Sequence, residues 1–437
     1  MDCRVRCPGV RTASNLRRIP GHLAKNTRPV RAARSLEKPG LPFPPAKTLT
    51  SSPLWASAFR PFYFLGALYA PLLIAAWLGA FLGLWSLPAG ELPLKLQHGH
   101  EFIFGFAAAI ISGIVLTALP SWAGTREILG GRLVLLVALW LIGRIAFWAT
   151  PWLPPLLSAT IDCMLFPVMF AMLTPQLLRA ANRLYLLLLP ILFSLFAANV
   201  IYHHGLVTAN HGQSLTALRL AIYAIIVLYV LKGGVLAPIF TGNALRDKGR
   251  NTLAPCNMPL EIAATGALLL LAALDLGAAP SAWTGAAALA CAVLHGWRCA
   301  RWKGWLVADV PLVLVMHLGF GWLVLAFALK AAAELTGIVP EAAWLHAFTV
   351  GSLGLMMLGL MTRVSLRHTG RPLKVPGTML IAYGLMFAAA LLRLAATVHG
   401  FGSTVIALSA GLWAAAFALY FVVFRKVLVT PSAPRKA

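Results

Sequence analysis

Apolar runs long enough to cross a membrane recur from Phe59 almost to the C-terminus of this 437-residue chain. A helix needs roughly 20 apolar residues to span the hydrocarbon of a bilayer. Inside hydrocarbon the protein must hydrogen-bond all its own backbone groups, so the choice is between helices and a closed β-barrel. Uninterrupted runs such as residues 184–199 lack the polar–apolar alternation of a barrel strand. The sequence therefore predicts an all-α, polytopic membrane helix bundle.

The charge content agrees, because only 11% of the residues are charged, whereas soluble domains carry about 25%. The length rule predicts about twelve transmembrane helices within residues 53–425. Their approximate limits are 60–85, 101–121, 132–149, 153–177, 184–203, 216–239, 258–276, 282–300, 308–329, 343–364, 377–397 and 402–424.

Lysine and arginine are concentrated in every second connection between the predicted helices, and the C-terminal tail 426–437 is also basic. The basic connections contain Arg126, Arg132, Arg179, Arg183, Arg246, Lys248, Arg250, Arg298, Arg301, Lys303, Arg367, Arg371 and Lys374. The alternate connections hold little beyond Lys95, Arg219 and Lys330. Cytoplasmic loops of membrane proteins carry such an excess. This alternation predicts that both termini are cytoplasmic, and it supports an even number of helices.

Residues 1–52 form a basic tail in which Asp2 and Glu37 are the only acidic residues. A transit peptide, a disordered basic tail and a start codon assigned too early all fit this composition, so we exclude the tail from the fold. The net charge of +24 lies in this tail and in the short loops. Membrane topology explains such a distribution, and we do not expect nucleic-acid binding.

The six cysteines form no C-x-x-C pair and no C-x-x-C-H motif. The sequence therefore excludes covalent attachment of a c-type haem. Most of the cysteines lie in or beside apolar runs, where we expect them to act as small apolar filler.

Seven histidines are predicted at or near one face of the bundle, most of them at its outer end. They are His98, His100, His203, His204, His317, His346 and His399. Imidazole is the commonest metal ligand in proteins. His317 is predicted about midway along its helix, at a depth where an ionisable residue indicates function. The set predicts a haem or metal site in the outer half, although an ordinary interfacial polar group is the simpler interpretation of any single histidine at the outer end.

His98 and His100 flank Gly99 at the entry of the second predicted helix. In a regular helix, positions i and i+2 point about 200° apart, so the two imidazoles cannot share a ligand there. They can converge only if the helix entry is frayed at Gly99.

Two charged residues, Arg144 and Asp162, are predicted within the membrane on neighbouring helices. A structural ion pair is the simpler interpretation, and a haem propionate as the partner of Arg144 is the alternative. Asn199 is placed to bond across helices or to orient a ligand. Met357 and Met361 share one helical face, which favours a packing stripe over a Cu(I) site.

Nine groups of residues stand out in order along the chain. They are AFRPFY at 58–63, HGHE at 98–101 with FGF at 104–106, LTALPSW at 116–122, LIGR at 141–144, ANVIYH at 198–203, PIFTGNAL at 238–245, MHLGFGW at 316–322, HAFTVG at 346–351, and MTRV at 361–364 with HTGRPL at 368–373. The ordered set resembles the signature segments of the NnrS family over roughly residues 54–425. Two departures from the family pattern occur: residues 233–238 lack an expected arginine, and Gln97 replaces a tryptophan.

This resemblance implies a bacterial inner-membrane protein that contains haem and copper and is linked to denitrification and to the nitric oxide and nitrosative stress response. It implies no settled reaction, so we leave open whether the protein is an enzyme. The expected ligands of a non-covalent b-type haem and of copper are His98, His100, His203, His317 and His346. Glu101 and Asn199 are expected to fix ring tautomers, and Arg60, Arg144 and Arg363 to pair with propionates, although Arg60 and Arg363 are predicted near the inner face.

Two other functional classes remain open. Twelve helices with both ends inside also fit a transporter without haem, although no convincing internal repeat of the kind carriers often show is visible in the sequence. A haem–copper nitric oxide reductase is the other alternative, because such enzymes pair adjacent histidines, as at His203 and His204. The expected partners are membrane lipid and nitric oxide.

Overall fold

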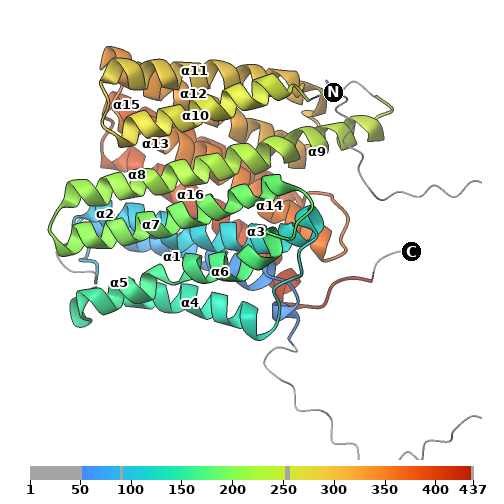
Figure 1. Ribbon diagram of the computed structural model, residues 1–437, viewed down its shortest axis with the longest axis horizontal. Coiled ribbons are helices and arrows are strands. Elements are labelled where there is room, and N and C mark those ends of the chain that lie inside the picture. Colours follow the sequence, from blue (N-terminus) through green and yellow to red (C-terminus); the bar gives the residue numbers. More distant parts are fainter. Residues whose placement is uncertain (1–51, 89–91, 251–255, 435–437) are drawn as a thin grey trace, which may run out of the picture. The chain divides into compact units, whose positions relative to one another are not determined.

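The computed structural model describes residues 52–88, 92–250 and 256–434, and within these ranges it contains helices and no strands. The helices run side by side along one direction (Figure 1). Eleven of the continuous helical rods in these ranges are long and apolar enough to cross a membrane, and α11 (Ser281–Arg301) is a twelfth, more polar one. The predicted all-α membrane bundle of about twelve helices is confirmed. The predicted N-terminal tail, apart from Ser52, lies outside the described residues.

The described rods fall into three successive groups of four. The first group is α1 (Phe59–Phe81), the rod of α2 (Leu94–His100), η3 (Glu101–Ala107) and α3 (Ala108–Ala123), then α4 (Gly131–Trp148), and α5 (Pro155–Cys163) with α6 (Leu165–Leu177). The second is η5 (Arg183–Leu187) with α7 (Leu188–Val207), the rod of α8 (His211–Leu228), η6 (Tyr229–Gly233) and α9 (Gly234–Asp247), then α10 (Met258–Leu276) and α11. The third is α12 (Pro311–Thr336), the rod of α13 (Ala342–His346), η8 (Ala347–Leu353) and α14 (Gly354–His368), then α15 (Gly377–His399) and α16 (Ser403–Val429). The short 3₁₀ turn η2 (Pro53–Trp55) precedes α1, and two more, η4 (Thr150–Trp152) and η7 (Gly304–Val307), lie between rods.

The predicted helix limits are close to the observed ones, with instructive exceptions. The prediction of 258–276 coincides with α10. The helix predicted at 216–239 instead runs from His211 to Asp247. Its start is fixed by Asn210, whose side chain accepts a hydrogen bond from the backbone N–H of Gln213 at 3.0 Å. The last helix continues to Val429, beyond the predicted end of the membrane domain at residue 425.

The first rod of each group packs against the last rod of another group. α7 packs against α5 and α6, α12 against α11, and α1 against α16, which closes the described rods into a ring. The inner end of α1 is tied to α16 by Arg60, which donates to the backbone carbonyls of Leu428 at 2.9 Å and Thr430 at 2.7 Å. The helices α3, α9 and α16 all end at the right of Figure 1, beside the basic connections. We call this the inner end and the opposite end the outer end.

The second rod of each group is the most enclosed. In these three rods 83, 67 and 67% of the most apolar window is buried, against 56% or less in the other eight membrane-length rods described. Each of the three contains a π-helical segment: η3, η6 or η8. Since π-helical segments are rare and concentrate at functional sites, these three central rods are the place to look for one.

A short sequence pattern is shared by two of the three four-helix groups. The segment from His100 to Gly105 and the segment from His346 to Gly351 share the pattern H-x-F-x-x-G, and in both a π-helical segment begins directly after the histidine. The sequence alone showed no convincing repeat. The four-helix groups therefore resemble one another in helix order and packing, and share very few residues in sequence.

Candidate metal centre

A cluster of buried polar side chains occupies the outer half of the first group and its border with α7. Its members come from six elements: α1, α2, η3, α4, α5 and α7. We call it the polar cluster, and it consists of Tyr69, His100, Glu101, Arg144, Asp162, Asn199 and His203. Polar groups at this depth must find partners within the protein. The cluster is the largest departure from an apolar interior among the described residues of this group.

His100 and His203 meet at the carboxylate of Asp162. The Nε2 atom of His203 lies 2.8 Å from Asp162 Oδ2, and the Nε2 atom of His100 lies 3.1 Å from the same oxygen. Donor atoms of the three side chains all lie within 4.8 Å of one another, and all three residues are buried. Two imidazoles and one carboxylate form a ligand set that suits a transition metal.

Arg144 supplies the positive charge of the cluster. Its guanidinium forms ion pairs with both Glu101 and Asp162. The predicted pairing of Arg144 with Asp162 is therefore confirmed. Two carboxylates and one guanidinium leave one uncompensated negative charge if both imidazoles are neutral, so a bound metal cation would improve the charge balance.

The neighbours of His100 hold its ring in place. The ring stacks on Phe147, with centroids 4.3 Å apart, and on Tyr202, at 4.4 Å. Its Nδ1 atom lies 3.0 Å from Glu101 Oε1. The Nδ2 group of Asn199 donates to Asp162 Oδ2 at 3.0 Å, and its Oδ1 atom accepts a hydrogen bond from His100 Nε2 at 2.9 Å. These two contacts are those expected of a side chain that orients ligands.

A small cavity adjoins the polar cluster, with a volume of about 220 Å³ that includes its mouth. Its lining combines aromatic and apolar side chains with three members of the cluster. The lining residues are Phe104, Leu139, Trp140, Arg144, Asp162, Leu165, Phe166 and Asn199. A diatomic molecule or a water could therefore approach Asp162 from this side.

His98 and His346 belong to a separate group that includes Arg393. The Nδ1 atom of His98 is buried and has no hydrogen-bond partner within the described residues, and the ring packs against Trp77 at 4.6 Å. His346 Nδ1 lies 2.8 Å from the carbonyl of Ala342, while its Nε2 accepts a hydrogen bond from Arg393 at 2.9 Å. The charge of Arg393 acts on both imidazoles. Arg393 was missed at the sequence level, although an arginine inside an apolar run was the available signal.

His317 lies apart from these groups. It was predicted about midway along its helix, but α12 begins at Pro311, so His317 is in the second turn at the inner end. Its Nε2 atom bonds to the hydroxyl of Thr241 at 2.8 Å, and its ring lies 6.2 Å from that of Trp302. The prediction of depth was wrong because the helix starts three residues later and runs further outward than predicted.

The two other predicted arginines also lie at the inner end. Arg60 binds the last carbonyls of α16, as described above, and the Arg363 guanidinium lies 3.6 Å from the ring centroid of Phe240. These contacts give each arginine a packing role distant from the polar cluster.

A second buried ion network escaped the sequence analysis. The predicted helix limits put Lys330 in a connection, but α12 continues to Thr336 and buries it. Its Nζ atom lies 2.5 Å from Asp275 and 2.8 Å from Glu334. Tyr223 donates to the other oxygen of Asp275 at 2.9 Å. These contacts join α8, α10 and α12 near the outer end and give the buried ammonium of Lys330 two carboxylate partners.

The fold and the polar cluster define a class: a multi-pass membrane protein with a buried imidazole–carboxylate site. A model of the NnrS protein family matches residues 53–432, which is most of the chain. The chain therefore belongs to the NnrS family. No curated protein matches the chain.

Proposed function

We propose that this protein is a bacterial inner-membrane protein that holds copper and a non-covalent b-type haem in its outer half and acts in the response to nitric oxide. Membership of the NnrS family supports the link to nitric oxide. The observation that carries the proposal is the buried set of His100, Asp162 and His203.

Copper is assigned to the polar cluster. Mixed nitrogen and oxygen donors suit Cu(II). His100, Asp162 and His203 would supply them, while Arg144 and Asn199 hold the carboxylate in position. When bound, copper supplies a one-electron redox centre.

Haem is assigned to the group of His98 and His346. The buried Nδ1 atom of His98 has no hydrogen-bond partner among the described residues, so it would be available to bind the haem iron. The carbonyl of Ala342 fixes the tautomer of His346 with the proton on Nδ1, so Nε2 has the lone pair. That lone pair accepts a hydrogen bond from Arg393, and it would bind haem iron once Arg393 turns to a propionate. Arg393 would pair with a propionate, the role that was expected of Arg60, Arg144 and Arg363.

The test is to purify the whole protein in detergent, record its absorption spectrum, and assay iron and copper. We expect a Soret band that is lost in His98→Ala and His346→Ala and kept in His317→Ala, because His317 lies at the other end of the bundle. Copper should stay in all three variants. Loss of the Soret band in His317→Ala alone would move the haem to the inner end, and its absence from the wild-type protein would refute the haem assignment.

A carrier is the second candidate, and the repetition of four-helix groups favours it. Four rods per group return the chain to the same end, so the groups are parallel, as in several carrier folds. A carrier without cofactor would contain neither iron nor copper, so the same metal assay separates the two proposals. The reductase alternative is weakened by His204, which is exposed and bonded to Gln213 at 2.9 Å, away from His203 and its metal-binding partners.

A further inference from the structure

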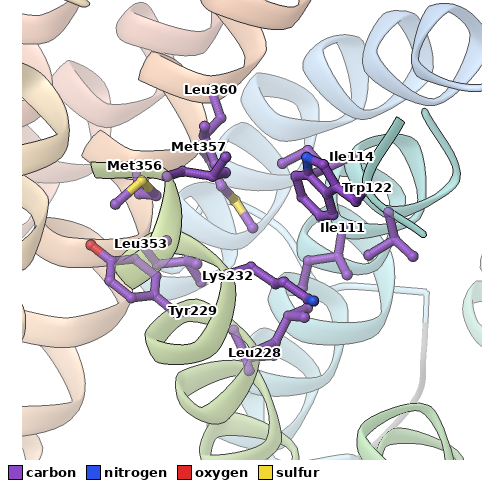
Figure 2. Close-up of a pocket in the computed structure, with 14 residues that line it drawn as sticks. Ile111, Ile114, Trp122, Leu228, Tyr229, Lys232, Leu353, Met356, Met357 and Leu360 are labelled. Carbon is purple, nitrogen blue, oxygen red and sulfur yellow. The ribbon is translucent and has the colours of Figure 1, made fainter. Parts of the chain in front are cut away.

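A cavity lies between the three central rods and has no role in the proposed function. Its volume is about 560 Å³, including the space at its mouth. All of its lining residues come from the second rod of each group (Figure 2). They are Ile111, Ile114, Val115, Trp122, Ile225, Leu228, Tyr229, Lys232, Gly233, Leu236, Leu353, Met356, Met357 and Leu360. We call it the axial cavity.

The lining contains one charged side chain, Lys232, and no carboxylate. Lys232 extends from η6 across the cavity toward Ile111 (Figure 2). Its Nζ atom lies 4.0 Å from the ring centroid of Tyr185 and 5.6 Å from that of Trp122. Among the described residues no ion pair with a carboxylate involves Lys232. Aromatic faces offset only part of the cost of desolvating a half-buried cation, so the site favours an anionic ligand.

The π-helical segment η6 (Tyr229–Gly233) sets the direction of Lys232. A π-helical turn inserts an extra residue and changes the face on which the following side chains lie. The aromatic partners mark the depth of the amine: Trp122 is in the last turn of α3, and Tyr185 is in η5, both at the inner end. Tryptophan and tyrosine gather at the membrane–water interface, which is the level of lipid headgroups.

We propose that the axial cavity binds an anionic phospholipid, with its phosphate at Lys232 and an acyl chain along the apolar lining. The apolar lining with a single charged group is that of a small-molecule site. A zwitterionic lipid would bring an ammonium group, and the lining offers no carboxylate to receive it. The basic connections at the inner end also attract anionic lipids.

The experiment is native mass spectrometry of the full-length protein in detergent, titrated with phosphatidylglycerol or phosphatidylcholine. Wild-type protein should retain one phosphatidylglycerol, and Lys232→Gln should weaken this binding about tenfold, because a charge-assisted contact is lost. Lys232→Arg should restore it. Lys248→Gln is the matched control, because this lysine lies just beyond α9 and pairs with Asp309 outside the cavity.

A second variant, Leu236→Trp, fills the lining and leaves Lys232 in place, so it should also lose the lipid. Lys232→Gln removes a half-buried cation, and its melting temperature should not fall. Unchanged affinity in both variants, equal binding of phosphatidylcholine, or tighter binding of oleate would overturn the proposal. Iron and copper content should be the same in Lys232→Gln and wild type, so this test stands or falls separately from the cofactor assignment.

Discussion

His98 and His100 are separated by one residue, yet they belong to different side-chain groups. α2 is regular from Leu94 to His100, so the two rings point to different sides of the rod. His100 enters the polar cluster, and His98 turns toward Trp77 and the group of His346. The convergence that a frayed entry would allow does not occur.

Asp162 shows what sequence reasoning missed at this scale. The sequence placed it opposite Arg144, which is correct. The second carboxylate oxygen, Oδ2, however, is contacted by the side chains of His100, Asn199 and His203. These partners lie on other rods and far from Asp162 along the chain, so no local pattern linked them to it, although Asn199 and His203 lie one turn apart on α7.

The adjacent histidines His203 and His204 provide a matched pair for testing the copper site. His203 is buried and contacts Asp162, whereas His204 is exposed and bonds to Gln213. We expect His203→Ala to lower the copper affinity at least about tenfold and His204→Ala to leave it unchanged. Copper titration of the purified variants measures this. Equal effects of the two substitutions would show that the polar cluster does not hold the metal.

At the scale of the element, the π-helical segment η3 brings Glu101 and Gly105 to the cluster. A methyl group on Gly105 would lie 2.8 Å from Tyr69 Cε1 and 3.1 Å from Glu101 Oε2. Glycine is therefore required for the close approach of α1. A methyl group on the corresponding Gly351 of η8 would lie even closer to a neighbour, 2.4 Å from Trp322 Cδ2.

This close approach leads to a prediction with an internal control. Gly105→Ala should destabilise the protein by about 1–3 kcal/mol, because the added methyl forces Tyr69 away from Glu101. Gly384→Ala in α15 meets no atom within 4 Å and should change stability by less than about 1 kcal/mol. Thermal unfolding in detergent compares the two. Similar melting temperatures would mean that the contact with Tyr69 is readily relieved.

At the scale of the whole molecule, the alternation of basic and neutral connections predicts which end faces the cytoplasm. Ile338, between α12 and α13, is exposed at the outer end, and Glu127, between α3 and α4, is exposed at the inner end. In intact cells a membrane-impermeant maleimide should label Ile338→Cys above the parent background. Glu127→Cys should gain label only after the membrane is disrupted. The reverse pattern would invert the predicted topology and place the cofactors on the cytoplasmic side.

The sequence determined the class of fold, the approximate helix limits and the ends of the bundle, because hydropathy and charge are read locally along the chain. It also picked out most members of the polar cluster, since a charge within an apolar run is conspicuous, but it passed over Arg393 and Lys232. Arg144 with Asp162 is the clearest case.

Only the tertiary structure decided which rods lie at the centre, which histidines meet and where His317 stands. The physical reason is that lipid and the protein interior are about equally apolar. Hydropathy therefore does not predict which face of a helix packs on another helix. The ring of three four-helix groups, the shared oxygen of Asp162 and the axial cavity all arise from that lateral packing.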